Sequence, residues 1–386
     1  MTAVVVAGVG QTPVGEHWDT ALRDLALEAI RAAIRDSGEL RPQALFVGNM
    51  LAPSLSNQAH LGALLVDHAY LHGIEAVTLE AAGASGGAAL RQGYLAVASG
   101  MVDIALVVGA EKFTDLVGAK AETALSTTAD SDFESVQGIT PTAQAAMIMQ
   151  RYMHDYSVPG DGLAGFALTA HANGEGNPNA MFRKAIKPEA YASAPIVNDP
   201  LRQFDIAPNA EGAAAVVLAR ADRLPQDAQR SQVRIAGSAS AIDTLALHDR
   251  NDVLHFECCR LSAERALKQA GLSLEDVDLF EYHDAFGIYA ALALEAVGFA
   301  QRGLAWRLAA DGGIARDGRI PAATMGGLKA RGFAGGATGV YQAVEATIQL
   351  QGRAGTNQIK DANCGLIQSV GGPASTAVTH VLQIAS

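Results

Sequence analysis

Four short motifs hold the residues that could do chemistry in this chain of 386 residues. The first, EAAGASGGAAL at residues 80–90, lies between a strand-like run and a helix-like run. Enzymes often place a nucleophile at such a junction, because the N-terminus of the following helix stabilises negative charge. The place expected for a nucleophile here is Gly83, which has no side chain. The other motifs hold His283 in HDAF, Phe333 in GFAGGATG and Ser369 in SVGGP.

These residues differ in the chemistry that they allow. The imidazole of His283 can donate or accept a proton near neutral pH, whereas the ring of Phe333 can do neither. The hydroxyl of Ser369 is a poor base without help and serves better as a hydrogen-bond donor. Structural alternatives stay open, because Gly83 could serve a tight turn and His283 could be a satisfied core histidine.

Repeated elements must position these motifs. Apolar residues recur at helical spacing in residues 20–39, and an apolar strand-like run follows at residues 44–49. A second part of the chain repeats this plan. In both parts a glycine turn, a helix and a buried strand follow. The matching segments are residues 20–48 and 261–284, 84–111 and 335–372, and 212–220 and 376–384. Two copies of a βαβαβ-like unit with uniformly apolar strands predict layered sheets that are covered on both faces.

A segment of different composition separates the two copies. Residues 114–205 are richer in Asn, Pro, Met and charged residues than their surroundings. We expect an inserted loop or lid domain there, and such loops usually carry recognition. The predicted division is an N-terminal half of residues 1–113 plus 206–230, this insert, and a C-terminal half of residues 231–386.

The bulk composition argues against several function classes. A net charge of −12 without any Lys/Arg-dense run argues against nucleic-acid binding. The first residues predict a buried strand and not a signal peptide, and no apolar run reaches membrane-spanning length. Cys258, Cys259 and Cys364 lack zinc-site spacing, and no acidic residue follows a first βα turn at the distance that NAD binding requires. We expect a cytoplasmic protein without a metal, NAD or a membrane partner.

Over essentially its whole length the chain resembles the thiolase superfamily. The motifs that carry the resemblance, in family order, are VAGVGQTPVGE, EAAGASGGAALRQGYLAVASG, IALVVGAEK, AHANGEGNPNAMFRKAI, EYHDAFGIYAALALEAVGF and TMGGLKARGFAGGATG. The HDAF motif is most similar to the archaeal and sterol-carrier-protein types. The resemblance implies an α/β class protein with a duplicated βαβαβ thiolase fold, layered α-β-α-β-α, and a CoA-thioester pocket between the halves. It also implies a homodimer or tetramer, and a small zinc-ribbon/OB-fold protein as a possible partner.

The resemblance also shows which thiolase residues are missing. The nucleophilic cysteine of the family's ACASGG pattern falls on Gly83, so no acyl group can be bonded there. The histidine of the GHP pattern falls on Phe333. The acid/base cysteine falls on Ala285 in one branch of the family and on Ser369 in the other.

The thiolase positions that could stabilise negative charge are still occupied by suitable groups. His283 occupies the position that the classical family gives to an asparagine, which orders a water at an oxyanion site. The backbone amides of Gly83 and Gly371 could still form a second oxyanion hole, since such a hole needs N–H groups and no side chain. We therefore name His283 and Ser369 as candidate catalytic residues, with Gly83, Phe333 and Ala285 as pocket walls at the lost catalytic positions.

Further candidates are weaker on sequence grounds. Arg183 and Lys184, with Lys187 beside them, could bind the phosphates of CoA, although charged clusters on loops are usually solvated. Tyr341 could project its hydroxyl into the pocket or bury its ring, and Tyr282 is expected to pack.

Three functions are compatible with this pattern. The first is an enzyme acting on acyl-CoA by aldolase or Claisen-type C–C chemistry without an acyl-cysteine, which needs an oxyanion hole and an acid/base group. The second is a non-catalytic subunit or scaffold that binds acyl-CoA or pairs with an active partner. The third is an acetyl-CoA acetyltransferase, which would require Cys364 or a partner's residue as a replacement nucleophile.

Overall fold

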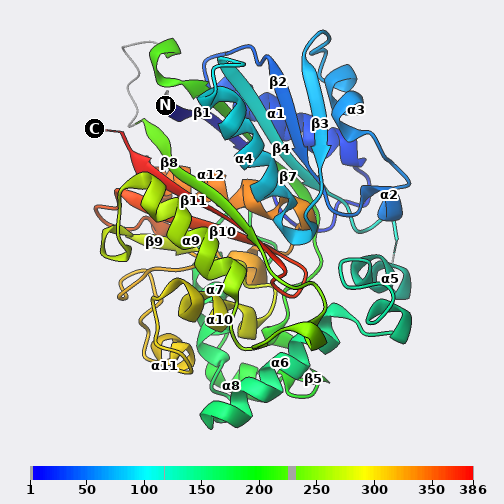
Figure 1. The fold of residues 1–386 in the computed structure, drawn as a ribbon, viewed down its shortest axis with the longest axis vertical. Helices are drawn as coiled ribbons and strands as arrows, with labels where there is room; N and C mark the ends of the chain where they lie inside the picture. Colours follow the sequence, from blue (N-terminus) through cyan, green and yellow to red (C-terminus); the bar gives the residue numbers. More distant parts are fainter. Residues whose placement is uncertain (1–2, 117, 225–231, 386) are drawn as a thin grey trace.

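The computed structural model describes residues 3–116, 118–224 and 232–385 (Figure 1). Within these residues the main sheet has the strand order β3-β2-β4-β7-β1-β8-β11-β10-β9, and β5 and β6 form a separate pair. Its strands are β1 Val4–Gln11, β2 Ala44–Gly48, β3 Glu75–Leu79, β4 Ile104–Glu111, β7 Gly212–Arg220, β8 Val233–Ile242, β9 Leu279–Glu281, β10 Cys364–Gly371 and β11 Thr376–Ile384. The small pair is β5 Ile196–Asn198 and β6 Leu201–Arg202.

Helices cover both faces of this sheet and form most of the insert. The helices are α1 Leu22–Asp36, α2 Ala52–Leu55, α3 Leu61–His68, α4 Ser85–Ala98, α5 Ala119–Ser126, α6 Pro141–Tyr156, α7 Ala164–Glu175, α8 Pro188–Ala192, α9 Glu257–Ala270, α10 Gly287–Val297, α11 Ala305–Ala310 and α12 Thr338–Leu350. Amphipathic helices such as α1 pack their apolar face on the strands, because burial of that face drives the docking.

The two halves repeat one strand plan. In the first half β1 and β4 flank β7 in antiparallel pairs, and β2 pairs with β4 in parallel. In the second half β8 and β10 flank β11 in antiparallel pairs, and β9 pairs with β10 in parallel. The half-sheets join where Val5 and Val6 of β1 meet Arg234 and Val233 of β8. This arrangement confirms the predicted duplication and the α/β class.

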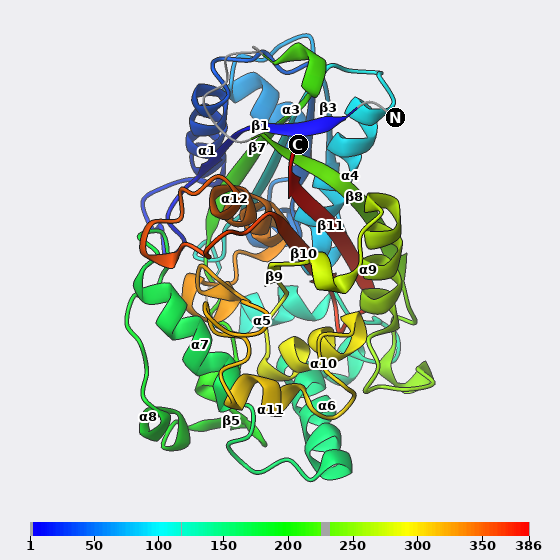
Figure 2. The same cartoon turned by 90° about the vertical axis from the view of Figure 1, so that its left-hand side faces the viewer.

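The layers follow from which helices touch which strands. Helix α1 packs on β1, β4 and β7 of the first half, and α9 packs on β8, β10 and β11 of the second (Figures 1 and 2). Helices α4 and α12 lie between the half-sheets and contact strands of both. One hydrophobic cluster therefore joins Leu90 and Val97 of α4, Val344 of α12, Val107 of β4 and Ile367 of β10. The order α-β-α-β-α agrees with the predicted layering.

The insert is more helical than a loop domain. Helices α6 and α7 share a hydrophobic cluster with α9 and α10, through Met149, Phe166, Cys259 and Leu292 among others. Apolar residues such as Tyr152 and Phe166 are fully buried there, so the insert is packed onto the C-terminal half (Figure 2). The proposed division into three domains stays a prediction, and its boundary between residues 230 and 231 lies outside the described residues.

One strand is shorter than its sequence pattern predicts. The apolar run at residues 277–284 forms a strand only over Leu279–Glu281. The side-chain amide of Gln342 donates to the backbone carbonyls of Glu281 and Tyr282, at 3.1 and 2.9 Å. The chain leaves the sheet at this point, which frees His283 from strand geometry. Among the described helices, none has the length and apolar character needed to cross a bilayer.

Candidate active site

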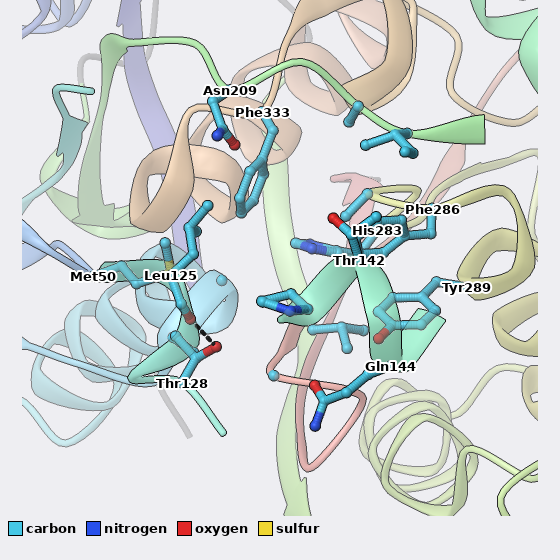
Figure 3. Close-up of a pocket in the computed structure, with 18 of the residues that line it drawn as sticks. Met50, Leu125, Thr128, Thr142, Gln144, Asn209, His283, Phe286, Tyr289 and Phe333 are labelled. Carbon is cyan, nitrogen blue, oxygen red and sulfur yellow. Dashed lines mark hydrogen bonds between the residues drawn. The ribbon is translucent and has the colours of Figure 1, made fainter. Parts of the chain in front are cut away.

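A cavity of about 290 Å³ lies where the two halves and the insert meet. Met50 and Gly83 come from the first half, Leu125 and Gln144 from the insert, and His283 from the second half (Figure 3). The remaining lining residues are Ala82, Glu122, Thr128, Pro141, Thr142, Ile206, Ala207, Pro208, Asn209, Ala285, Phe286, Tyr289, Phe333, Val370 and Gly372. The walls are mostly apolar with a few polar groups, which is typical of a small-molecule site.

Gly83 lies in the cavity wall beside the imidazole of His283. It sits in a short 3-10 helix, Ala82–Ala84, that leads into α4. The positive φ of this turn, 50°, belongs to Ala82, so backbone freedom at Gly83 does not explain the glycine. A Cβ at Gly83 would lie 2.6 Å from the carbonyl oxygen of Val370 and 2.9 Å from Cε1 of His283. The backbone around it therefore has no room for a side chain unless a neighbour moves.

His283 places its imidazole in the cavity (Figure 3). Its Nδ1 is buried without a hydrogen-bond partner among the described residues. Burial, and secondarily the nearby Arg331 guanidinium, lower the pKa of His283 to about 3. The ring is therefore neutral at physiological pH, and an Nε2–H tautomer can donate a hydrogen bond towards the Gly83 side of the cavity.

Phe333 and Ala285 both line this cavity. The Phe333 ring lies 6.3 Å from that of Phe113 between centroids. Its backbone N–H donates to Pro208 O at 2.9 Å, and its carbonyl accepts from Ala210 N at 3.0 Å. These bonds hold the backbone of Phe333 against residues 208–210, which precede β7.

A buried carboxylate ties this wall to the first half of the chain. Glu111, at the end of β4, accepts hydrogen bonds from the backbone N–H groups of Met50 and Gly336, at 2.8 and 2.9 Å. The amide of Asn49 donates to it as well, at 2.8 Å. Burial raises the pKa of Glu111 to about 7 in spite of these donors. Glu111 thereby joins Met50 to the loop that carries Phe333.

Ser369 does not fit the catalytic role that we predicted for it. It is 1% exposed, its Oγ donates to Oε1 of Gln342 at 3.0 Å, and it is absent from the cavity lining. Side chains alternate along β10, so Val370 faces the cavity while Ser369 packs against Gly87 of α4. We therefore treat Ser369 as a structural hydrogen-bond donor.

Gly371 ends β10 between two residues that line the cavity, Val370 and Gly372. A Cβ at Gly371 would lie 2.3 Å from the carbonyl oxygen of Ala81. The chain thus brings the turn around Gly83 and the end of β10 into contact. An oxyanion hole built from the Gly83 and Gly371 amides stays a prediction.

The cysteines and two tyrosines lie away from the cavity. Cys258, Cys259 and Cys364 are buried, and none of them lines it. Burial and the nearby Asp278 raise the pKa of Cys364 to about 12, which disfavours a reactive thiolate. Tyr341 is buried and donates to Thr12 O at 3.1 Å. Tyr282 packs its ring against Phe280 at 5.6 Å.

The basic cluster lies outside this cavity. Arg183, Lys184 and Lys187 are exposed on the segment between α7 and α8. None of them lines the cavity. Their contact with the phosphates of CoA stays a prediction.

Sequence reasoning missed six polar residues that line the cavity. They are Glu122 of α5, Thr142 and Gln144 of α6, Tyr289 of α10, and Thr128 and Asn209, which lie outside the helices (Figure 3 labels all but Glu122). Burial raises the pKa of Glu122 above its usual range. For Glu122, Thr128, Thr142 and Gln144 the only signal was that the insert would carry recognition. Tyr289 lies within the motif EYHDAFGIYAALALEAVGF, but nothing in that motif set it apart as a cavity residue. Among the described residues, no cluster of three or more His, Cys, Asp or Glu side chains is placed to hold a metal ion.

Comparisons with known proteins agree with this architecture. Residues 4–222 match the family model "Thiolase, N-terminal domain", and residues 239–384 match "Thiolase C-terminal domain-like". The chain is 41% identical over 383 residues to an acetyl-CoA acetyltransferase of Methanothermobacter thermautotrophicus, covering 99% of both chains. It is 27% identical over 365 residues to the 17-hydroxy-3-oxo-4-pregnene-20-carboxyl-CoA lyase of Mycobacterium tuberculosis, covering 90% of this chain and 91% of that one.

A solved structure extends the likeness to three dimensions. The structure described as "Ltp2-ChsH2(DUF35) aldolase" superposes with a TM-score of 0.83 at 22% identity, over 99% of this chain and 98% of that one. At that identity the likeness concerns the fold alone. The family models and the archaeal relative together cover both halves, the insert and the cavity, and on that basis the chain belongs to the thiolase family.

Proposed function

We propose that this protein binds an acyl-CoA thioester and breaks or forms a C–C bond beside the thioester carbonyl, as an aldolase, without a covalent acyl-cysteine. One observation carries the proposal. The cavity sets the neutral imidazole of His283 against the side-chain-free Gly83, and no cysteine lines it. Such a site can stabilise charge on a thioester oxygen but has no sulfur to bond to the carbonyl carbon.

The reaction balances without a cofactor. In the cleavage direction a base removes the proton of a β-hydroxyl group, and the β-carbon becomes a carbonyl as the Cα–Cβ bond breaks. The bonding electrons pass to the thioester as an enolate, which then takes up a proton at Cα to give the shorter acyl-CoA. His283 Nε2–H would donate to the enolate oxygen, with the Gly83 and Gly371 amides as further donors.

Glu122 is the acid/base group that we propose for these proton transfers. His283 is unsuited to the task, because a pKa of about 3 makes it a weak base. Glu122 lines the same cavity, and burial raises its pKa, which makes its carboxylate a stronger base than an exposed one. Phe333 would form an apolar wall for the acyl group.

The relatives support CoA-thioester chemistry of two kinds. The archaeal relative is named an acetyltransferase, and the mycobacterial relative is named a lyase of a steroid acyl-CoA. We favour the second kind, since acyl transfer needs a nucleophile that this cavity does not offer. A non-catalytic subunit that binds acyl-CoA is the second candidate, favoured by the replacement of three thiolase residues at Gly83, Phe333 and Ala285.

Assembly is part of the proposal. Strand β3 lies at one edge of the sheet, and its residues Glu75, Ala76 and Val77 are exposed. Val77 borders a surface hollow with Leu95 and Met101, of which Met101 is 83% exposed. We propose that this edge pairs with a second copy in a homodimer. The DUF35 protein named with the aldolase structure supports a small second polypeptide, as predicted from the family resemblance.

The test is to incubate the protein with β-hydroxyacyl-CoAs that have linear, cyclic and steroid acyl groups. We expect release of a ketone or aldehyde together with the shortened acyl-CoA, and loss of this activity in His283→Ala and in Glu122→Gln. His380→Asn is the control, because it alters an equally buried imidazole that does not line the cavity. Formation of an acyl–protein adduct with acetyl-CoA would contradict the proposal and favour a transferase.

A further inference from the structure

The wall of the cavity that the insert provides begins with the N-terminus of helix α6. Pro141, Thr142 and Gln144, all in its first turns, line the cavity. Thr140 caps the helix by accepting from the N–H of Ala143 at 3.1 Å. The N–H of Thr142 has no intrahelical partner in this position, and the helix dipole makes the end of α6 electropositive. This end of the cavity favours an electron-rich group.

Gln144 adds an independent observation on the same wall. The side chain is 1% exposed, and its Nε2 has no hydrogen-bond partner among the described residues. A buried amide without a partner is costly, and such groups in native proteins usually meet a water or a ligand. Figure 3 shows this side chain at the cavity together with Tyr289. Turning the amide by 180° about its last side-chain bond exchanges its oxygen and nitrogen, so Gln144 can offer an unused donor at the edge of the site.

Tyr289 places a second donor on this wall. Its ring is held edge-on by Phe256 and Phe286, with centroids 5.4 and 5.1 Å away. Burial raises the pKa of the Tyr289 phenol; by smaller amounts, the nearby Arg250 lowers this pKa and Glu134 raises it. The hydroxyl stays protonated at neutral pH and can donate. Both donors of this wall are therefore neutral.

We infer that Gln144 and Tyr289 form a subsite for a neutral carbonyl oxygen carried on the acyl group away from the thioester. The inference rests on the proposed binding of acyl-CoA and names the class of acyl group: a keto- or oxo-substituted one. A carboxylate fits less well, because Glu122 lines the same cavity and would repel a second negative charge. A plain alkyl chain would leave the two donors unpaired.

The experiment measures dissociation constants by calorimetry with the full-length protein. The probes are hexanoyl-CoA, 5-oxohexanoyl-CoA and adipoyl-CoA, the eight-carbon analogues of these three, and free CoA. We expect the oxo compound of at least one length to bind about tenfold more tightly than its alkyl counterpart, with the dicarboxylic compound weaker than the oxo compound. In Gln144→Leu the preference for the oxo compound disappears, while alkyl compounds bind as before.

A matched control lies on the same helix. Gln150→Leu removes an exposed amide of α6 that does not line the cavity, and this variant should keep the wild-type preference. The midpoint temperature of thermal unfolding of Gln144→Leu should not lie below that of the wild type, because an apolar group of similar size replaces an unpaired buried amide.

Three results would overturn the inference. One is an absence of preference for the oxo compound at both chain lengths. Another is a preference for the carboxylate. The third is an equal loss of affinity for free CoA in Gln144→Leu, which would assign the amide to the pantetheine arm. Binding with the expected preference but without any C–C cleavage would remove the aldolase proposal and leave the subsite standing, whereas failure of every thioester to bind would remove both.

Discussion

The ring of Phe333 lies edge-on to the imidazole of His283, with the centroids 5.7 Å apart and the planes at 82°. The contact puts an apolar edge beside the one imidazole that lines the cavity within the described part of the chain. Together with Gly83, whose Cβ position would lie 2.9 Å from Cε1 of His283, this pair defines the corner in which we propose that the thioester oxygen binds. The polar and the apolar parts of the cavity thus meet at one point.

Truncation of Phe333 should weaken binding of apolar acyl groups. We expect Phe333→Ala to raise the dissociation constant of octanoyl-CoA about tenfold, because the lost ring surface no longer covers the chain. Phe133→Ala is the control, since Phe133 is 65% exposed and does not line the cavity. Isothermal titration of both variants checks this, and unchanged affinity in Phe333→Ala would show that the ring does not touch the acyl group.

A side chain at Gly83 should destabilise the fold. We expect Gly83→Ala to lower the free energy of unfolding by about 1–3 kcal/mol, because its Cβ would collide with the carbonyl oxygen of Val370. Gly160→Ala is the matched control, as a Cβ there meets nothing within 4 Å. Urea denaturation of the two variants gives the comparison, and equal stability would mean that the Gly83 turn relaxes freely.

Acid should destabilise the protein through its buried imidazoles. Burial lowers the pKa of both His283 and His380 to about 3, against about 6.5 in the unfolded chain. Between about pH 6.5 and 3 the unfolded state binds more protons than the folded state. As the pH is lowered through this range, the free energy of unfolding decreases by about 1.4 kcal/mol per pH unit for each imidazole. His283→Asn should flatten the pH dependence of the unfolding free energy by that slope.

The comparison with the wild type matters in this measurement, because buried carboxyls act in the opposite sense. Burial raises the pKa of Glu111 to about 7, so the folded state gains a proton there before the unfolded state does. If the unfolding free energies of His283→Asn and of the wild type change equally with pH between pH 6 and 4, the imidazole of His283 is not held neutral in the folded protein.

The native protein should contain no reactive thiol. All three cysteines are buried, and desolvation raises the pKa of Cys259 well above its ordinary value. We expect slow labelling by a thiol reagent under native conditions, fast labelling of all three after unfolding, and no acyl adduct after incubation with acetyl-CoA. Mass spectrometry of the intact chain checks each point, and a stable acetyl group on Cys364 would revive the transferase.

A buried ion pair supports the loop that carries Phe333. Nη1 of Arg331 lies 2.6 Å from Oε2 of Glu345, and both residues are 1% exposed. Removing the carboxylate in Glu345→Ala should cost about 3–5 kcal/mol of unfolding free energy, since the guanidinium stays buried without its partner. The double variant Arg331→Met/Glu345→Leu should be more stable than Glu345→Ala in the same denaturation experiment. The reverse order would mean that the pair itself is a large net stabiliser.

The chain sequence by itself determined the duplicated layers and the positions of the site motifs. The helical spacing of apolar residues in α1 and the uniformly apolar runs of β4 and β7 are local patterns. Such patterns can be recognised in the sequence without knowing which residues are in contact. The same holds for the absence of a side chain at Gly83 and of a proton donor at Phe333, since both follow from residue type alone.

Tertiary structure decided which side chains face the cavity. Ser369 and Val370 are neighbours in the chain, yet the alternation of β10 turns one towards α4 and the other towards the site. Glu122 and Gln144 reach the cavity from helices that no motif marks. The neutral state of His283 depends on desolvation by groups that are distant in sequence, and burial of that kind exists only once the two halves and the insert have packed together.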